Sequence, residues 1–273
     1  MLRQPLKQVS IGGTGVGKTF ENMRFIKEVY SNPKLPDARK CLIYDVNKEF
    51  KDIKPIAPED IPHFIRQKKI EIRRVLPDDA YGNELGMDEK YELLCDMVDN
   101  YQFRNGLLYL EDINNYVTTA NTKHLINLLT TNRHKLLDIF ISLQTFGALP
   151  PRIWGNVNVL NIHKANDDPF QSRIKNQISG KIEPLRIANI MVTTKTQFDP
   201  RFFCTFNFGT LKITGKFTTP DFIDACEKYL ALNRRLVQDQ MVMNSISKDE
   251  AQRRLLVQLM QKYNGNVQLK SKN

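Results

Sequence analysis

The feature that most constrains this chain is a glycine-rich stretch near its start, SIGGTGVGKTF at residues 10–20. It satisfies the pattern G-x-x-x-x-G-K-[ST], in which glycines let backbone N–H groups curl around phosphate oxygens. Residues 7–11 before it are typical of a strand and residues 19–30 after it of a helix, which is the context that such a loop requires. The candidate phosphate-binding residues are Gly12, Gly13, Thr14, Gly15, Val16, Gly17, Lys18 and Thr19.

Two side chains of this loop have separate expected roles. Lys18 reaches the β- and γ-phosphate oxygens as a point charge, and the Thr19 hydroxyl ligates Mg²⁺. The chain contains no N-K-x-D motif, which would read guanine, so the sequence favours ATP over GTP. The expected cofactors are therefore ATP and Mg²⁺.

Short apolar runs alternate with amphipathic segments through about the first 165 residues, which is the pattern of βαβ units around a parallel sheet. Several runs are apolar on successive residues, as in a sheet covered on both faces. The expected strands are 7–12, 41–46, 69–75, 106–112, 137–144 and 156–163, and the expected helices are 18–30, 84–101 and 122–134. The Pro-rich interval 52–62 is expected to be a loop with short turns. The sequence predicts an α/β P-loop NTPase with a mainly parallel central sheet flanked by helices.

The pattern changes after residue 168. Helices are expected near 170–178 and 184–191, a β-hairpin within 201–217, and a further helix that begins with Thr219 as its N-cap. A last helix is expected over 249–263. The predicted divisions are a P-loop ATPase core at 1–168, a completion of the core with the hairpin at 169–218, a helical extension at 219–264 and a disordered tail at 265–273.

Composition narrows the class of protein. No run approaches the roughly 20 apolar residues of a membrane span, and the first residues do not read as a signal peptide, so we expect no transmembrane segment and a cytoplasmic location. Four scattered cysteines without metal-site spacing suit reduced thiols rather than disulfides or zinc. The net charge of +10 favours a polyanionic partner such as nucleic acid, with a solvated basic surface as the alternative.

A second motif supplies the acids that a phosphate loop needs. In GLLYLEDINN, residues 106–115, four apolar residues deliver Glu111 and Asp112 to the end of a strand. Such acids fix Mg²⁺ and orient an attacking water. By position Glu111 lies on the metal side and Asp112 at the catalytic place, but the sequence leaves open which acid has which role. Both are therefore candidate catalytic residues and candidate metal ligands beside Thr19, and the alternative is that they cap the following segment.

Two further segments carry a family resemblance. CLIYDVNKEF, residues 41–50, resembles the D-x-x-x-E-[FY] signature that follows the second strand in FtsK/HerA-type DNA-pumping ATPases. NRHKLLDIFISLQTF, residues 132–146, places Arg133 eleven positions before Gln144 and resembles the family's R-[KR]-x-G…(S/T)-Q segment. The resemblance covers about residues 7–165 and is nearest in style to small viral genome-packaging ATPases and Zot-like phage ATPases. The Glu111-Asp112 order is inverted, and Leu136 stands in the place of a glycine, so a different turn is expected after Arg133.

The resemblance implies a ring-forming RecA/FtsK/HerA-like motor, a hexamer or a pentamer, with ATP bound between neighbouring subunits. Arg133 is then the candidate arginine finger, with Arg152, Arg173 and Arg201 as rivals and a cation at a helix C-terminus as the alternative. Gln144 is expected to orient the water or to report the γ-phosphate. A polar strand-end residue bonded to backbone is the alternative for Gln144.

The expected function is an ATP-hydrolysing DNA translocase, most of all a viral genome-packaging ATPase that works as a ring. The alternatives are a Zot-like phage assembly or extrusion ATPase and a plasmid or conjugative DNA-transfer ATPase. The expected partners are double-stranded DNA, with single-stranded DNA as second choice, further copies of the chain, and capsid vertex proteins. The expected location is the host cytoplasm, or the virion. Candidate cations for the DNA backbone are Lys48, Lys51, Lys54, Arg73, Arg74, Lys164 and Lys175.

Overall fold

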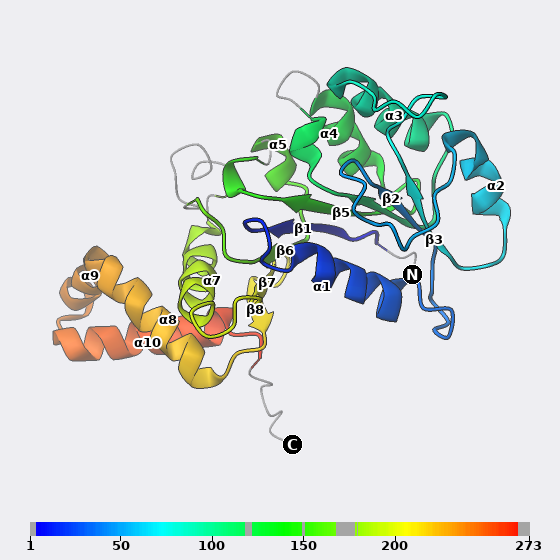
Figure 1. The fold of residues 1–273 in the computed structure, drawn as a ribbon. Helices are drawn as coiled ribbons and strands as arrows, with labels where there is room; N and C mark the ends of the chain where they lie inside the picture. The colour runs from blue at the N-terminus through cyan, green and yellow to red at the C-terminus, as the bar shows by residue number, and fades with distance from the viewer. Residues whose placement is uncertain (1–3, 118–121, 149–150, 168–177, 179, 267–273) are drawn as a thin grey trace.

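Residues 4–117, 122–148, 151–167, 178 and 180–266 are described by a computed structural model of the protein, drawn as a ribbon in Figure 1. Within these residues, eight strands form one sheet in the order β3-β2-β4-β5-β1-β6-β7-β8. The strands are β1 Lys7–Ile11, β2 Cys41–Tyr44, β3 Ile72–Val75, β4 Leu107–Leu110, β5 Asp138–Leu143, β6 Val159–Ile162, β7 Cys204–Asn207 and β8 Lys212–Gly215. Neighbouring strands from β3 to β6 are parallel, whereas β7 and β8 are antiparallel to their neighbours. The predicted α/β fold with a mainly parallel sheet is confirmed.

Helices cover both faces of the sheet. In Figure 1, α1 lies on one face and α3 and α4 lie on the other. The helices are α1 Lys18–Phe25, α2 Ile61–Arg66, α3 Met87–Asp99, α4 Thr122–Thr131, α5 Pro151–Trp154, α7 Ile182–Lys195, α8 Thr219–Leu232, α9 Arg234–Asn244 and α10 Lys248–Tyr263. α1 continues as a π-helical turn, Ile26–Tyr30, so helical backbone fills the whole predicted span.

α2 is a helix that the sequence did not predict. The Pro-rich interval before it favours a loop, but Pro58 and Pro62 stand at the starts of a 3₁₀ turn and of α2. Proline is tolerated there because the first N–H groups of a helix have no intrahelical partner. The prolines therefore begin helical structure instead of excluding it.

The residues of β2 show how the apolar pattern divides between the two faces. Cys41 and Ile43 pack in one cluster with Met23 of α1. Leu42 and Tyr44 belong to the core on the opposite face. Because successive side chains of a strand point to opposite faces, an uninterrupted apolar run buries both faces of the sheet.

The C-terminal part confirms the predicted hairpin and helical extension. β7 and β8 extend the sheet beyond β6, α7 packs against them, and α8 packs against α7 and α10. The N-cap of α8 is Thr218 and not Thr219: its Oγ1 accepts the Asp221 N–H at 3.4 Å, and the Asp221 carboxylate accepts the Thr218 N–H at 2.8 Å. This reciprocal pair places the cap one residue before the predicted one.

Several sequence expectations lie outside the described residues. They are the helix near 170–178, apart from Ile178, the residues Arg173 and Lys175, and the part of the predicted tail from 267 onward.

Candidate nucleotide-binding site

The phosphate loop connects β1 to α1 at the carboxyl end of β1, as the sequence predicts. Gly17 precedes α1 with φ of 92°, a left-handed conformation that glycine adopts without steric cost. At Gly12, a Cβ would lie 2.6 Å from the Cβ of His163, which follows β6. Glycine is therefore required at both ends of the motif. Gly17 needs it for its backbone conformation, and Gly12 needs it because His163 lies so close.

The side chain of Lys18 folds back over this loop. Its Nζ donates to the carbonyl oxygens of Gly12 at 2.8 Å and Gly13 at 2.9 Å, and the residue is only 7% exposed. Burial lowers the pKa of Lys18, and the charges of Asp112 and Glu111 act in the opposite direction. The ammonium thus lies between the loop and the acids that follow β4.

Glu111 lies against the start of α1. The Thr19 hydroxyl donates to Glu111 Oε1 at 2.9 Å, and no donor among the described residues bonds the buried Oε2. Burial raises the pKa of Glu111. A buried carboxylate oxygen without a donor, beside a hydroxyl, is the kind of oxygen pair that a hard divalent cation binds. Thr19 and Glu111 therefore fit Mg²⁺, which usually takes one or two protein ligands besides phosphate oxygens and water.

Asp112 lies on the other side of Glu111 and is held by two amides. Gln144, directly after β5, donates its Nε2–H to Asp112 Oδ2 at 3.3 Å, and Asn47, after β2, donates its Nδ2–H to the same oxygen at 3.2 Å. Asp112 precedes the turn Ile113–Asn115, but its side chain makes no capping hydrogen bond there. The structure thus brings Asp112 and Gln144 together and adds Asn47, which the sequence analysis missed although it lies within the D-x-x-x-E segment.

The acid of that segment has a positioning role. Asp45 is buried, and its carboxylate accepts the backbone N–H groups of Glu49 at 2.9 Å and Phe50 at 3.2 Å. Arg74 on β3 pairs with the same carboxylate at 2.8 Å. Asp45 therefore fixes the loop that carries Asn47 toward Asp112.

Arg133 lies far from the phosphate loop of its own chain. Arg133 belongs to the turn before β5, at the amino ends of the strands: in the same turn, the Lys135 carbonyl accepts the N–H of Asn105, which lies just before β4. The phosphate loop lies at the carboxyl ends of the same parallel strands. Arg133 is exposed. Leu136, which stands in place of glycine, has φ of 50°, so the turn keeps a left-handed residue without glycine.

The candidate DNA-binding cations divide into two groups. Arg73 pairs with Glu71, Arg74 pairs with Asp45, and Lys48 pairs with Asp78 at 2.8 Å. In the part of the chain that the structure describes, no ion pair engages the remaining described members, Lys51, Lys54 and Lys164. Lys48, Arg73 and Arg74 are therefore already engaged by acids of their own chain, and their role as DNA-binding cations stays a prediction.

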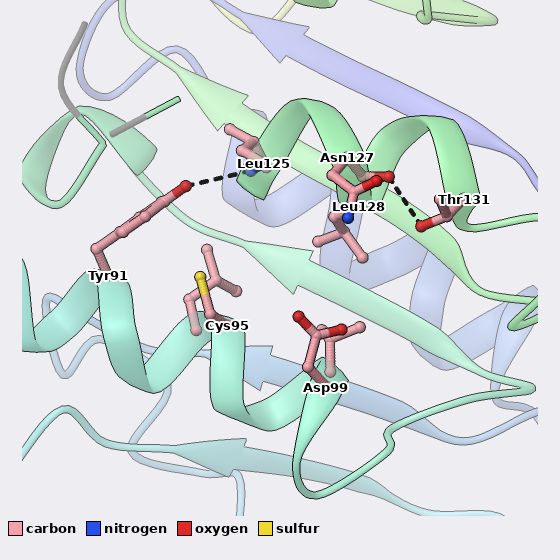
Figure 2. Close-up of a pocket in the computed structure, with 9 residues that line it drawn as sticks. Tyr91, Cys95, Asp99, Leu125, Asn127, Leu128 and Thr131 are labelled. Carbon is pink, nitrogen blue, oxygen red and sulfur yellow. Dashed lines mark hydrogen bonds between the residues drawn. The ribbon is translucent and has the colours of Figure 1, made fainter. Parts of the chain in front are cut away.

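A second pocket lies between α3 and α4, away from the phosphate loop (Figure 2). Its volume is about 20 Å³, and Tyr91 accepts the Leu125 N–H across it at 3.2 Å. Burial raises the pKa of Cys95 on its wall to about 11, so this thiol is not an activated nucleophile. A space of this size holds about one water molecule, which makes it a packing gap between helices.

The described residues include no helix that is both long and apolar enough to cross a bilayer. They also include no group of three or more His, Cys, Asp or Glu side chains placed to share a metal ion.

No protein-family model matches this sequence. No curated protein matches it. Among solved structures, the genome packaging NTPase B204 from Sulfolobus turreted icosahedral virus 2, in complex with AMPPCP, is similar with a TM-score of 0.53 and 16% identity over 77% of this chain and 96% of that chain. Its complex with ATP-gammaS gives a TM-score of 0.51 and 15% identity over 77% of this chain and 95% of that chain. The N-terminal domain of zonular occludens toxin from Neisseria meningitidis gives a TM-score of 0.38 and 14% identity, over 63% of this chain and 90% of that chain. The chain therefore has the fold of a viral genome-packaging NTPase, which confirms at the level of the fold the resemblance carried by its motifs.

Proposed function

We propose that this chain is an ATP-hydrolysing motor that moves double-stranded DNA into a viral capsid, working as a ring of identical subunits. The observation that carries the proposal is the position of Glu111, Asp112 and Gln144 around a phosphate loop with Lys18 at its centre. The likeness in fold to a genome packaging NTPase supports the choice of cargo.

In this proposal, Lys18 exchanges the loop carbonyls for the β- and γ-phosphate oxygens of ATP. Thr19 and Glu111 would hold Mg²⁺, which neutralises charge on those oxygens when it is bound. The backbone N–H groups of residues 13–19 surround the phosphates.

Asp112 polarises the attacking water. Both amide donors bond its Oδ2, which leaves Oδ1 to accept a proton from water. Gln144 and Asn47 fix the carboxylate from opposite sides, since they follow different strands. A fixed acceptor costs little reorganisation at the moment of reaction, which is the usual source of catalytic power in such sites.

The arginine finger is assigned to Arg133, acting on the nucleotide of a neighbouring subunit. Its position at the opposite edge of the sheet from its own loop, together with its exposure, fits action between subunits. A guanidinium that approaches the γ-phosphate from a second subunit couples hydrolysis in one subunit to the position of the next.

DNA contacts are assigned to cations without acidic partners. Lys164 directly follows β6, next to the phosphate loop. Lys51 and Lys54 lie in the segment that returns from β2 to the side of β3, where the Arg74 N–H donates to the Lys54 carbonyl at 3.2 Å. The net charge of +10 is consistent with binding along a phosphate backbone without sequence readout. The motor is then expected in the host cytoplasm and at the capsid vertex.

The test is the ATPase rate of the full chain with and without double-stranded DNA at low salt, with the oligomeric state measured by analytical ultracentrifugation. We expect DNA to stimulate turnover and nucleotide to favour a ring. Stimulation by single-stranded DNA alone would favour an extrusion or DNA-transfer ATPase. If no DNA binds or stimulates, the translocase proposal fails.

A further inference from the structure

The strand order assigns the two sides of the phosphate loop to different parts of a nucleotide. β4 and β5 lie on one side of β1 and carry the acids and Gln144, whereas β6 and β7 lie on the other side. The terminal phosphates face Lys18 and the acids in the proposed function. The nucleoside of an extended triphosphate therefore lies away from them, on the side of β6 and β7.

An aromatic ring and a guanidinium meet at this side. Phe20, next to the Mg²⁺ candidate Thr19, is 55% exposed on the first turn of α1. The Cζ of Arg201, from the segment between α7 and β7, lies 5.3 Å from the centroid of the Phe20 ring. Two flat, partly exposed groups are thus held beside the phosphate loop by segments far apart in the sequence.

The stem of Arg201 is anchored on the loop itself. A Cβ built on Gly17 would lie 3.4 Å from Arg201 Cγ and 3.6 Å from its Cδ, and the Arg201 N–H donates to Asp199 Oδ1 at 3.0 Å. Among the described residues, no carboxylate pairs with the guanidinium of Arg201. The stem of Arg201 thus lies against the loop, and its exposed guanidinium lies beside the Phe20 ring.

A cavity of about 330 Å³ lies beside this pair. It is lined by residues 13–16 of the loop and by Lys164, Asn166, Thr196 and Pro200, the last being the chain neighbour of Arg201. Ligand pockets begin at about this size, roughly 300 Å³. The Asn166 amide offers both a donor and an acceptor to a polar group in the cavity.

We propose that Phe20 and Arg201 form the binding site for the nucleobase of the nucleotide, with the base stacked on the pair and the ribose directed to the cavity lined by Asn166. This proposal rests on nucleotide binding at the phosphate loop and adds the recognition of the base. Guanidinium planes and phenyl rings stack on any flat heterocycle, and the larger area of a purine makes purines the better ligands.

The experiment compares two ligands that share the phosphates and differ in the base. The dissociation constants of ATP and of inorganic tripolyphosphate are measured by calorimetry with Mg²⁺ present, on the chain of residues 1–273. We expect Phe20→Ala and Arg201→Ala to weaken ATP binding by about 5- to 100-fold, the usual cost of a lost stacking partner. Tripolyphosphate binding should stay within about twofold of the wild type, since stacking makes no contact with phosphate.

Matched controls are Tyr81→Ala and Arg235→Ala, which remove an aromatic ring and a guanidinium away from the loop. Tyr81 is 91% exposed, and the side chain of Arg235 is 93% exposed. They should change neither constant. Arg201→Lys keeps the charge and loses the plane, so it should weaken ATP binding nearly as much as alanine.

Two results overturn the base site while leaving the proposed function intact. Unchanged ATP affinity in both alanine variants removes the stacking role. An equal loss of ATP and tripolyphosphate affinity in Arg201→Ala makes this residue a phosphate cation. If the wild type binds neither ligand, the nucleotide-binding proposal itself fails.

Discussion

The phosphate loop separates two regions that differ in burial and in bonding. On the β4–β5 side, Glu111 is 3% exposed and the carboxylate of Asp112 accepts two amide donors. On the β6–β7 side, Phe20 and Arg201 are partly open to solvent and touch each other and the loop. Groups that stabilise charge in a transition state are fixed before the substrate arrives. A surface on which a base stacks must instead be exposed, so that the base can reach it.

We call the β4–β5 side, which carries Glu111, Asp112 and Gln144, the acid side of the loop. The largest expected effect comes from removing Lys18, the cation that faces these acids. Lys18→Ala should reduce ATP turnover to the background of the assay, because it removes the ammonium that lies over the loop and would contact the β- and γ-phosphates. Phosphate release at saturating ATP measures this change. Lys34→Ala, at an exposed lysine in the segment after α1, should keep the wild-type rate. Normal turnover in Lys18→Ala would contradict the site.

A second experiment asks whether the acid side is completed by another subunit. Arg133→Ala should lower turnover by about 10³-fold and spare ATP affinity, because a finger acts on the transition state. In rings that mix variant and wild-type chains, the fraction of activity lost should exceed the fraction of variant chains. Arg104→Ala is the matched control, since Arg104 is exposed near the same edge of the sheet. An unchanged rate would assign the finger to another arginine.

Variants of Glu111 and Asp112 should differ in how their ATPase rates depend on the Mg²⁺ concentration. Asp112→Asn should lower turnover by at least about 100-fold even at saturating Mg²⁺, because the proton acceptor is lost. Glu111→Gln should instead raise the Mg²⁺ concentration needed for half-maximal turnover, since its carboxylate lies against Thr19. Titration of the ATPase rate with Mg²⁺ measures both effects. The opposite pattern would exchange the two roles.

Asn47 gives a smaller and more specific test of how the acid side is held. Asn47→Ala removes one of two donors to Asp112 and should reduce turnover by about tenfold, the value of one hydrogen bond to a charged group. Asn115, which donates to Asn47 at 3.0 Å, acts one step further away, so Asn115→Ala should cost less. Equal rates in the wild type and Asn47→Ala would show that Gln144 suffices.

The residues of the acid side were largely predictable from the sequence. Those of the β6–β7 side, Phe20 and Arg201, were not. Glu111, Asp112 and Gln144 each end a buried apolar run, and parallel strands bring their carboxyl ends to one edge. Lys18 and Thr19 follow from a local motif. These are patterns within short segments, where spacing alone fixes the placement of a side chain.

Contacts across long sequence distances were missed for a physical reason. Arg201 reaches Phe20 only because the segment before β7 returns to the loop, and no periodicity encodes that return. Asn47 could have been considered, since it lies within a conspicuous segment beside Asp45. The Thr218 cap could also have been found, because a threonine three residues before an acid is a capping pattern.

His163, directly beyond β6, offers a test by pH of how tightly the β6–β7 side closes under the loop. Its ring is buried, stacks on Phe203 with centroids 4.8 Å apart and lies against Gly12. Burial, and then the charge of Lys18, lowers the pKa of His163 from 6.5 to about 4. Below pH 6.5 the unfolded chain therefore binds a proton that the folded chain does not.

The free energy of unfolding should thus contain a contribution that is complete above pH 6.5 and is lost as the pH falls toward 4, by up to about 3 kcal/mol. Denaturant titrations across this range measure it. His163→Phe keeps a ring against Phe203 and removes the titration, so its stability should fall less steeply with acid than that of the wild type. Parallel curves for the two proteins would mean that the imidazole is hydrated in the folded state, and that His163 packs less closely against Gly12 than the lack of room for a Cβ there implies.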